Sequence, residues 1–214
     1  MQLTPIPDDI LPQALASLRA HLPPDSLALA VFERIAATLD LVPLGVDTPA
    51  HRAAGVKLAQ DFGIGTIDAE PMEAFSYDGQ SIRTRSEAYV LIHEVAHWLV
   101  APPERRGMID FGLGAGPESG RVEEANRATA VDKDTQIEEE ALSSLLGILW
   151  EVELRQPAIL AFLEQNWLEG WERAAGCADN FISHVELLHR RGLIDADGRP
   201  FPPESVTGAA RAAA

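Results

Sequence analysis

The stretch HEVAHW, residues 93–98, places two histidines and a glutamate at a spacing that can do chemistry. On an α-helix, residues four apart lie one above the other on the same face, so His93 and His97 can present two imidazoles to one metal ion. Glu94 follows the first histidine and can reach the open side of that ion, where a water molecule would bind. The pattern therefore predicts two metal ligands and a general base within one helical turn.

A pair of packed core histidines with polar partners would give the same pattern. The neighbouring helix positions are apolar, namely Leu91, Ile92, Val95 and Ala96. Burying two imidazoles among these side chains without polar partners would be costly. We therefore favour a metal site, with satisfied core histidines as the alternative.

Two protein ligands do not hold a catalytic metal, so we expect a third ligand further along the chain. Residues 138–140 are three consecutive glutamates, which a helix separates by about 100° per residue. The apolar residues around them define one broad face: Ile137, Ala141, Leu142, Leu145, Ile148, Leu149 and Val152. Glu138 points into this face, where a carboxylate needs a cation or several hydrogen bonds. Glu138 is the predicted third ligand, and Glu124 is its main competitor.

The elements that would position these residues are mainly α-helical, in an α+β arrangement with a small β component. Helices are predicted over residues 8–21, 25–39, 84–100, 136–155, 158–175 and 178–191, with Asp25 or Ser26 capping the second. The third of them is a zincin-like HExxH metal-binding helix, with a Thr84–Glu87 capping box at its start and Pro102 at its end. Short strands are predicted near 66–67 and 74–77, the latter followed by an Asp78-Gly79 turn. The Gly-rich stretch 108–120 is predicted to be non-helical.

The composition excludes several classes of protein. The net charge of −16 argues against binding to nucleic acid or to an anionic membrane surface, because both would repel the chain. The single cysteine, Cys177, excludes an internal disulfide and a cysteine zinc site. No signal peptide is visible, and the apolar runs are too short to span a bilayer. We expect an acidic, cytoplasmic protein with one metal-binding domain over residues 1–200, which includes the N-terminal helix pair, and a flexible tail over 201–214.

The run IHEVAHWLVAPPERRGMIDFG, residues 92–112, resembles the bacterial elongation factor P hydroxylase family. That family has a His-Glu-x-x-His-Trp core, a short linker, an Arg-Arg pair and then Asp-Phe-Gly. The matching residues here are His93, Glu94, His97, Trp98, Arg105, Arg106, Asp110, Phe111 and Gly112. A Gln-x-aromatic-Glu pattern of the family is echoed at residues 135–138, and this favours Glu138 over its neighbours.

The resemblance implies one divalent metal ion, held by two histidines and a carboxylate and used to hydroxylate a protein side chain, a modified lysine on a translation factor. It also implies that Trp98, Arg105, Arg106 and Asp110 surround the metal ligands or the substrate. At least one of the two arginines is expected to be solvated. Asp110 is expected to pair with an arginine or to orient a histidine.

The ligand set leaves three functional classes open. With zinc, Glu94 would activate a water molecule against a peptide bond, as in a metallopeptidase. With iron, two histidines and a carboxylate leave open positions for oxygen, as in a hydroxylase. A third class is a metal-stabilised binding module without catalysis. The expected cofactor is therefore zinc or iron, and the expected partner of an enzyme is a protein or peptide substrate.

Overall fold

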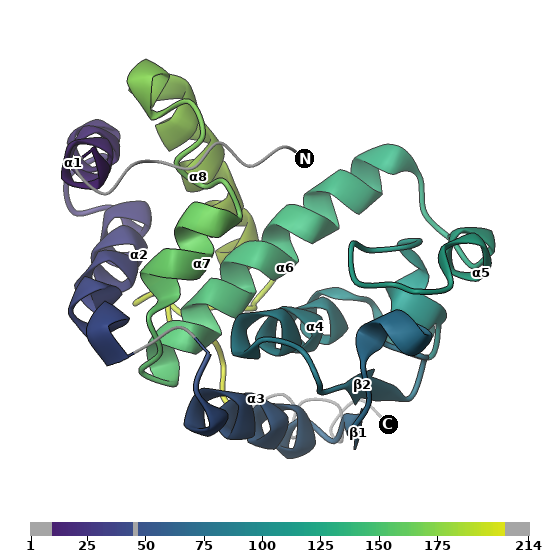
Figure 1. The fold of residues 1–214 in the computed structure, drawn as a ribbon. Helices are drawn as coiled ribbons and strands as arrows, with labels where there is room; N and C mark the ends of the chain where they lie inside the picture. Colours follow the sequence, from purple (N-terminus) through teal and green to yellow (C-terminus); the bar gives the residue numbers. More distant parts are fainter. Residues whose placement is uncertain (1–9, 45–46, 204–214) are drawn as a thin grey trace. The chain divides into compact units, whose positions relative to one another are not determined.

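The computed structural model describes residues 10–44 and 47–203, and the fold is mainly helical (Figure 1). The α-helices are α1 (Leu11–His21), α2 (Leu27–Ala36), α3 (Pro49–Asp61), α4 (Ala88–Val100), α5 (Val122–Arg127), α6 (Lys133–Glu153), α7 (Ala158–Glu164) and α8 (Ala174–Arg190). Short 3-10 segments are η1 (Ala37–Leu44), η2 (Pro71–Glu73), η3 (Pro103–Arg105), η4 (Ile109–Gly112) and η5 (Trp171–Arg173). Strands β1 (Gly65–Ile67) and β2 (Ser81–Arg83) pair in parallel, with Thr66 opposite Ile82. The prediction of a mainly helical protein with a small β component is confirmed.

The chain divides into two compact units, Met1–Val46 with Ile148–Phe201 and Asp47–Gly147 with Pro202–Ala214. The first unit contains α1, α2, α7 and α8, and its core holds a cluster of aromatic rings, namely Phe32, Phe162, Trp167 and Phe181. The second unit contains α3, α4, α5, the sheet and most of α6. The single domain predicted over 1–200 stays a prediction, and most of the predicted tail, from residue 204 onward, lies outside the described residues.

Helix α4 carries the two histidines, and it begins later than predicted. The proposed capping box is wrong, because the Thr84 hydroxyl donates to the Ile67 carbonyl at 3.2 Å and so extends the contact between the strands. The helix is capped from a distant part of the chain instead, since the Ala88 N–H donates to Asp47 Oδ1 at 3.1 Å. A carboxylate at this position satisfies a free helix N–H and complements the helix dipole. The end at Val100, before Pro102, agrees with the prediction.

Other elements differ from the prediction for identifiable reasons. Helix α3 was not predicted, although it has the usual start signals: Thr48 accepts a hydrogen bond from the His51 N–H, and Pro49 occupies the first turn. Within the segment predicted as the second strand, Tyr77 makes only an isolated bridge to Ile82, and β2 comes after the turn. The predicted turn is present, because Asp78 Oδ1 accepts from the N–H groups of residues 80 and 81.

The remaining predicted helices are present with shifted ends. Ser26 caps α2, where its hydroxyl accepts from the Leu29 N–H at 3.1 Å. The helix predicted over 158–175 ends at Glu164 as α7, and α8 begins at Ala174 rather than 178. None of the helices within residues 10–44 and 47–203 has the length and apolar character needed to span a lipid bilayer.

Candidate metal centre

Helices α4 and α6 bring three potential metal ligands together. His93, His97 and Glu140 place one ligand atom each within 4.8 Å of one another. The Nε2 atoms of the two histidines lie 2.9 Å apart, and the Glu140 carboxylate lies 3.2 Å from His93 Nε2 and 3.3 Å from His97 Nε2. The structure therefore turns both predicted histidines toward one point, with a carboxylate opposite them.

The carboxylate in this group is Glu140 and not the predicted Glu138. The reason lies in the face assigned to the helix: Ile137, expected to be buried, is 57% exposed, whereas Glu139 is only 5% exposed. From Leu142 to Glu151 every residue of α6 is buried, so the apolar residues do not mark one direction. The competitor Glu124 lies on α5, where it pairs with Arg121 at 3.6 Å.

Gly147 determines how closely α6 approaches the histidine helix. A Cβ atom at this position would lie 3.3 Å from the Cα and 3.6 Å from the backbone nitrogen of His93. Glu140 precedes Gly147 by seven residues, about two helical turns, and so shares its face. A glycine seven residues after a glutamate is the signal in the sequence that would have favoured Glu140.

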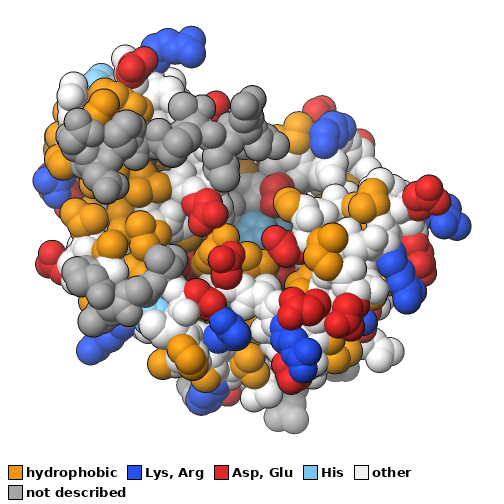
Figure 2. Space-filling view, in the orientation of Figure 1, with side chains coloured by type: hydrophobic (Ala, Val, Ile, Leu, Met, Phe, Trp, Pro, Cys, Tyr) orange, Lys and Arg blue, Asp and Glu red, His pale blue; other side chains and the backbone are white. Residues whose placement is uncertain are grey.

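The electrostatics of the group favour a cation. Burial lowers the pKa of His93, and the charge of His97 lowers it further, against the opposing effect of Glu140. Burial also disfavours charge on His97, but Glu140 and Glu94 outweigh it and raise the His97 pKa. The histidines likewise outweigh the burial of Glu140 and hold its pKa well below the usual range. On the face shown in Figure 2, acidic side chains gather around a recessed histidine surface.

Glu94, the candidate base, lies close to this group but outside it. Burial raises its pKa to about 8, and the charges of Asp110 and Glu140 act in the same direction. His97 and a hydrogen bond with Ser76 lower the Glu94 pKa in part. The environment of Glu94 therefore favours the neutral form of its carboxyl group, with burial as the largest cause.

The Asp-Phe-Gly segment forms a wall of the site through a rare backbone conformation. Asp110 and Phe111 are consecutive non-glycine residues with φ of 41° and 56°, and Gly112 follows with φ of 72°. This turn stacks the Phe111 ring on His97, with the ring centroids 5.6 Å apart. The Phe111 ring also stacks on Tyr77, with the ring centroids 4.3 Å apart. The segment thus fixes the ring plane of one histidine.

The hydrogen bonds of Asp110 go to neither of the two predicted kinds of partner, an arginine or a histidine. Its carboxylate accepts hydrogen bonds from the Ser119 hydroxyl at 2.5 Å and from the Tyr77 N–H at 3.2 Å. These bonds tie the Gly-rich loop to the segment before β2. Asp110 therefore holds the strained turn in place instead of pairing with an arginine.

The two arginines of the motif have separate structural roles. Arg105 is 8% exposed, pairs with Glu139 on α6 and donates to the Phe111 carbonyl at 2.9 Å. It therefore connects the residue next to Glu140 with the residue that stacks on His97. Arg106 is half-buried, and its guanidinium lies 4.1 Å from the centroid of the Trp98 ring. Its Nε also donates to the Ala101 carbonyl at 3.0 Å, so Arg106 is the more accessible of the two but is not a fully solvated arginine.

A comparison with protein families identifies the family that the part of the chain around the two histidines resembles. Residues 82–156 match the elongation factor P hydroxylase family. This match begins within β2 and includes α4, α5 and α6, and with them His93, His97 and Glu140. The resemblance inferred from the HEVAHW, Arg-Arg and Asp-Phe-Gly elements is thereby confirmed over this part of the chain. Comparison with curated proteins gives no match, and comparison with solved structures gives none.

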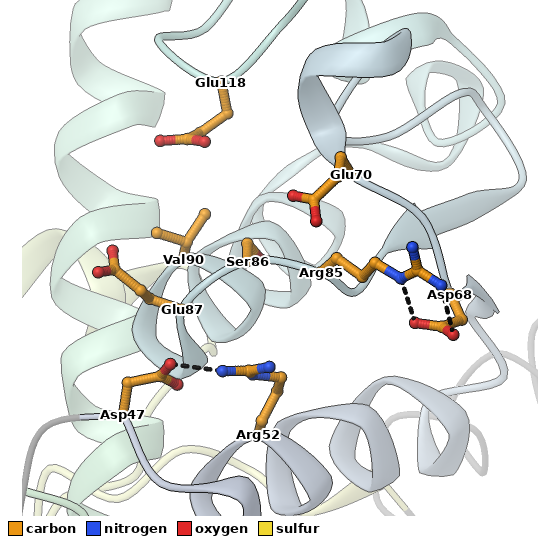
Figure 3. A pocket seen from close by; sticks show the side chains of 9 residues that line it. All are labelled: Asp47, Arg52, Asp68, Glu70, Arg85, Ser86, Glu87, Val90 and Glu118. Atoms are coloured by element: carbon orange, nitrogen blue, oxygen red, sulfur yellow. Dashed lines mark hydrogen bonds and ion pairs between the residues drawn. The ribbon is translucent and has the colours of Figure 1, made fainter.

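A cavity of about 530 Å³ adjoins the N-terminal end of α4 in the same unit (Figure 3). Its lining is formed by Asp47, Arg52, Asp68, Glu70, Arg85, Ser86, Glu87, Val90 and Glu118. The two arginines pair with Asp47 and Asp68, so the lining has three more carboxylates than guanidinium groups. The histidines do not line this cavity, but Val90 lies three residues before His93 on α4. An acidic hollow therefore has one of its lining residues about one helical turn before His93, and it is formed partly by residues of the matched segment and partly by residues 47–70.

Proposed function

We propose that this protein is a metal-dependent hydroxylase of the elongation factor P hydroxylase type, with a protein as its substrate. His93, His97 and Glu140 would hold one divalent ion on the zincin-like HExxH helix. The observation that carries the proposal is the convergence of these three ligand atoms within 4.8 Å, inside the segment that matches a family of hydroxylases.

The donor set fits such an ion. Two imidazole nitrogens 2.9 Å apart can share only one proton, whereas a cation between them would satisfy both rings and the carboxylate. Two histidines and one carboxylate leave coordination positions open, and iron in such a site supplies the activation of oxygen. The chain's own residues orient the ligands. Phe111 packs on the His97 ring, and the ion pair of Arg105 with Glu139 fixes the rotation of α6 next to Glu140.

The acidic cavity supports a substrate with a positively charged side chain. Its excess of carboxylates would attract an ammonium group, and Val90 offers apolar contact for an aliphatic stem. A lysine-derived side chain on a protein, as the resemblance to the family implies, combines these two properties. The metal held by His93, His97 and Glu140 would then lie near a carbon atom of that substrate side chain, or of a substrate residue next to it.

Zinc-dependent peptide hydrolysis is the second candidate, and the placement of Glu94 favours it. Glu94 directly follows His93 on α4 and its carboxyl group interacts with His97, so this partly buried group is near enough to the ligand group to be the base that a metallopeptidase requires. The two candidates differ in what they require from this residue. A peptidase needs Glu94 to activate water, whereas a hydroxylase uses it only to position groups or to deliver a proton.

The test compares iron-loaded and zinc-loaded protein on lysine-containing peptides, with and without oxygen and a reductant, and measures product masses. We expect a gain of one oxygen atom on intact peptides that requires iron, oxygen and reductant together. Glu94→Gln should then retain its metal and part of its activity. New peptide termini formed with zinc and without oxygen, and abolished by Glu94→Gln, would overturn the hydroxylase in favour of the peptidase. If no product forms and metal removal only lowers the melting temperature, the protein is a binding module.

A further inference from the structure

Two buried polar atoms on α4 and α6 have no hydrogen-bond partner among the described residues. One is Nδ1 of His93, the ring nitrogen turned away from the ligand group, and the other is the hydroxyl oxygen of Ser143. Ser143 is fully buried, at 0% exposure. Because a buried polar group without a partner is costly, a serine in this apolar part of α6 needs an explanation. Alanine would fill nearly the same volume without that cost.

Contacts on both sides of Ser143 place it opposite His93. Glu140, about one turn earlier on α6, contacts His93 Nε2 at 3.2 Å. Gly147, about one turn later, approaches the backbone of His93 so closely that a Cβ atom would lie 3.3 Å from its Cα. Residues 140, 143, 144 and 147 share one helix face, so two serines lie between the two residues that contact His93. Ser144 makes interactions of its own.

The chemistry of a metal-bound imidazole supplies the missing partner. When Nε2 faces a metal, Nδ1 carries the ring proton, and such an N–H almost always donates to an acceptor that fixes the ring. A serine hydroxyl can accept this bond, and its Cα–Cβ torsion can change between staggered rotamers. We propose that Ser143 is a positioning residue of the metal centre, accepting a hydrogen bond from His93 Nδ1–H. This inference rests on the proposed metal site but not on the hydroxylase reaction.

The first test measures the affinity of purified full-length protein for Zn²⁺ by competition with a chromophoric chelator. Ser143→Ala should weaken binding by roughly 10–100-fold, the usual effect of removing a partner of a metal-ligating histidine. The metal-free Ser143→Ala protein should be at least as stable as the wild type, because the change removes an unsatisfied buried hydroxyl. Ser144→Ala, on the same helix face, is the matched control and should leave the affinity unchanged.

Two results would overturn the proposal. Unchanged Zn²⁺ affinity in Ser143→Ala would mean that His93 Nδ1–H has another acceptor, such as the Tyr89 carbonyl four residues earlier on α4. A loss of stability in the metal-free Ser143→Ala protein that matches the loss of affinity would mean that Ser143 acts only in packing. Neither measurement depends on catalytic turnover. A negative result for Ser143 is therefore distinct from a failure of the protein to hydroxylate a substrate.

A second measurement observes the hydrogen bond directly. In cobalt-loaded protein, the exchangeable Nδ1 proton of His93 gives a paramagnetically shifted proton signal in NMR. A hydrogen bond to Ser143 slows exchange of this proton with solvent, so Ser143→Ala should broaden or remove the signal. Ser143→Cys, which offers a weaker acceptor of similar size, should give an intermediate exchange rate. Equal exchange rates in all three proteins would contradict the proposal.

Discussion

Replacing Arg105 with methionine tests how the site is held together. Arg105 and Glu139 are 8% and 5% exposed, so both charges are buried. The Arg105→Met change leaves the Glu139 carboxylate without its cation and the Phe111 carbonyl without its side-chain donor. Breaking one side of a buried pair costs about 3–5 kcal/mol of unfolding free energy. We expect a loss of this size in the metal-free protein.

A second substitution separates the ion pair from the rest of the loss. In Arg105→Met/Glu139→Leu the buried charge is gone, and apolar side chains of similar volume often replace a buried pair at no net cost. The Phe111 carbonyl still lacks its donor, so the double variant should remain about 1–3 kcal/mol below the wild type. Recovery of about 2 kcal/mol relative to the single variant is therefore the expected outcome.

The assay is urea unfolding followed by circular dichroism and by tryptophan fluorescence, since coincident curves establish a single transition. Arg106→Met is the matched control, because its half-buried guanidinium lies over Trp98 and contributes about 0.5–1 kcal/mol by that contact. A loss below about 1 kcal/mol in Arg105→Met, typical of an exposed pair, would refute the reasoning. So would a double variant no more stable than Arg105→Met.

Two further predictions concern single glutamates of α6. Glu140→Ala should lose stoichiometric Zn²⁺ on dialysis, and Zn²⁺ should no longer raise its melting temperature as it does in the wild type. Glu138→Ala should keep both properties. The reverse pattern would favour Glu138 as the ligand. Glu151 is 4% exposed, and burial, followed by the charge of Glu164, raises its pKa to about 8. Because the folded pKa exceeds the unfolded one, this group lowers stability as pH rises from about 4.5 to about 8. Glu151→Gln should therefore stabilise the protein by on the order of 2–4 kcal/mol near pH 8 and very little near pH 5, and a difference in urea unfolding independent of pH would contradict this.

The helix that carries the histidines could be predicted because its information is local. The i, i+4 spacing, the apolar residues between the histidines and the proline after Val100 all act within one or two turns. The start of α4 could not be predicted in this way. Its cap is Asp47, 41 positions before the Ala88 N–H that it accepts, and tertiary structure alone brings the two together.

The candidate third ligand shows a second limit of sequence patterns. An apolar face gives the direction of a side chain only when the opposite face meets water, and α6 is buried on all sides after residue 141. The rotation of α6 depends instead on two tertiary contacts, the ion pair of Glu139 with Arg105 and the close approach of Gly147 to His93. In the sequence, Glu139 and Arg105 look like ordinary surface charges, and Gly147 looks like an ordinary flexible glycine. Neither contact can therefore be recognised from the sequence.

The turn at Asp110 and Phe111 has a consequence for how this protein can evolve. Two consecutive non-glycine residues with positive φ cost about 1–3 kcal/mol each, and glycine would remove that cost at either position. Glycine at 111, however, would also remove the ring that packs on His97. Phe111 is also only 1% exposed, so its loss would leave a cavity that costs about 3–5 kcal/mol, more than the strain it relieves. Core packing and the orientation of His97 therefore both favour an aromatic ring at 111 in spite of the backbone strain. A homologue with glycine at this position would lose the stacking on Tyr77 and on His97 together.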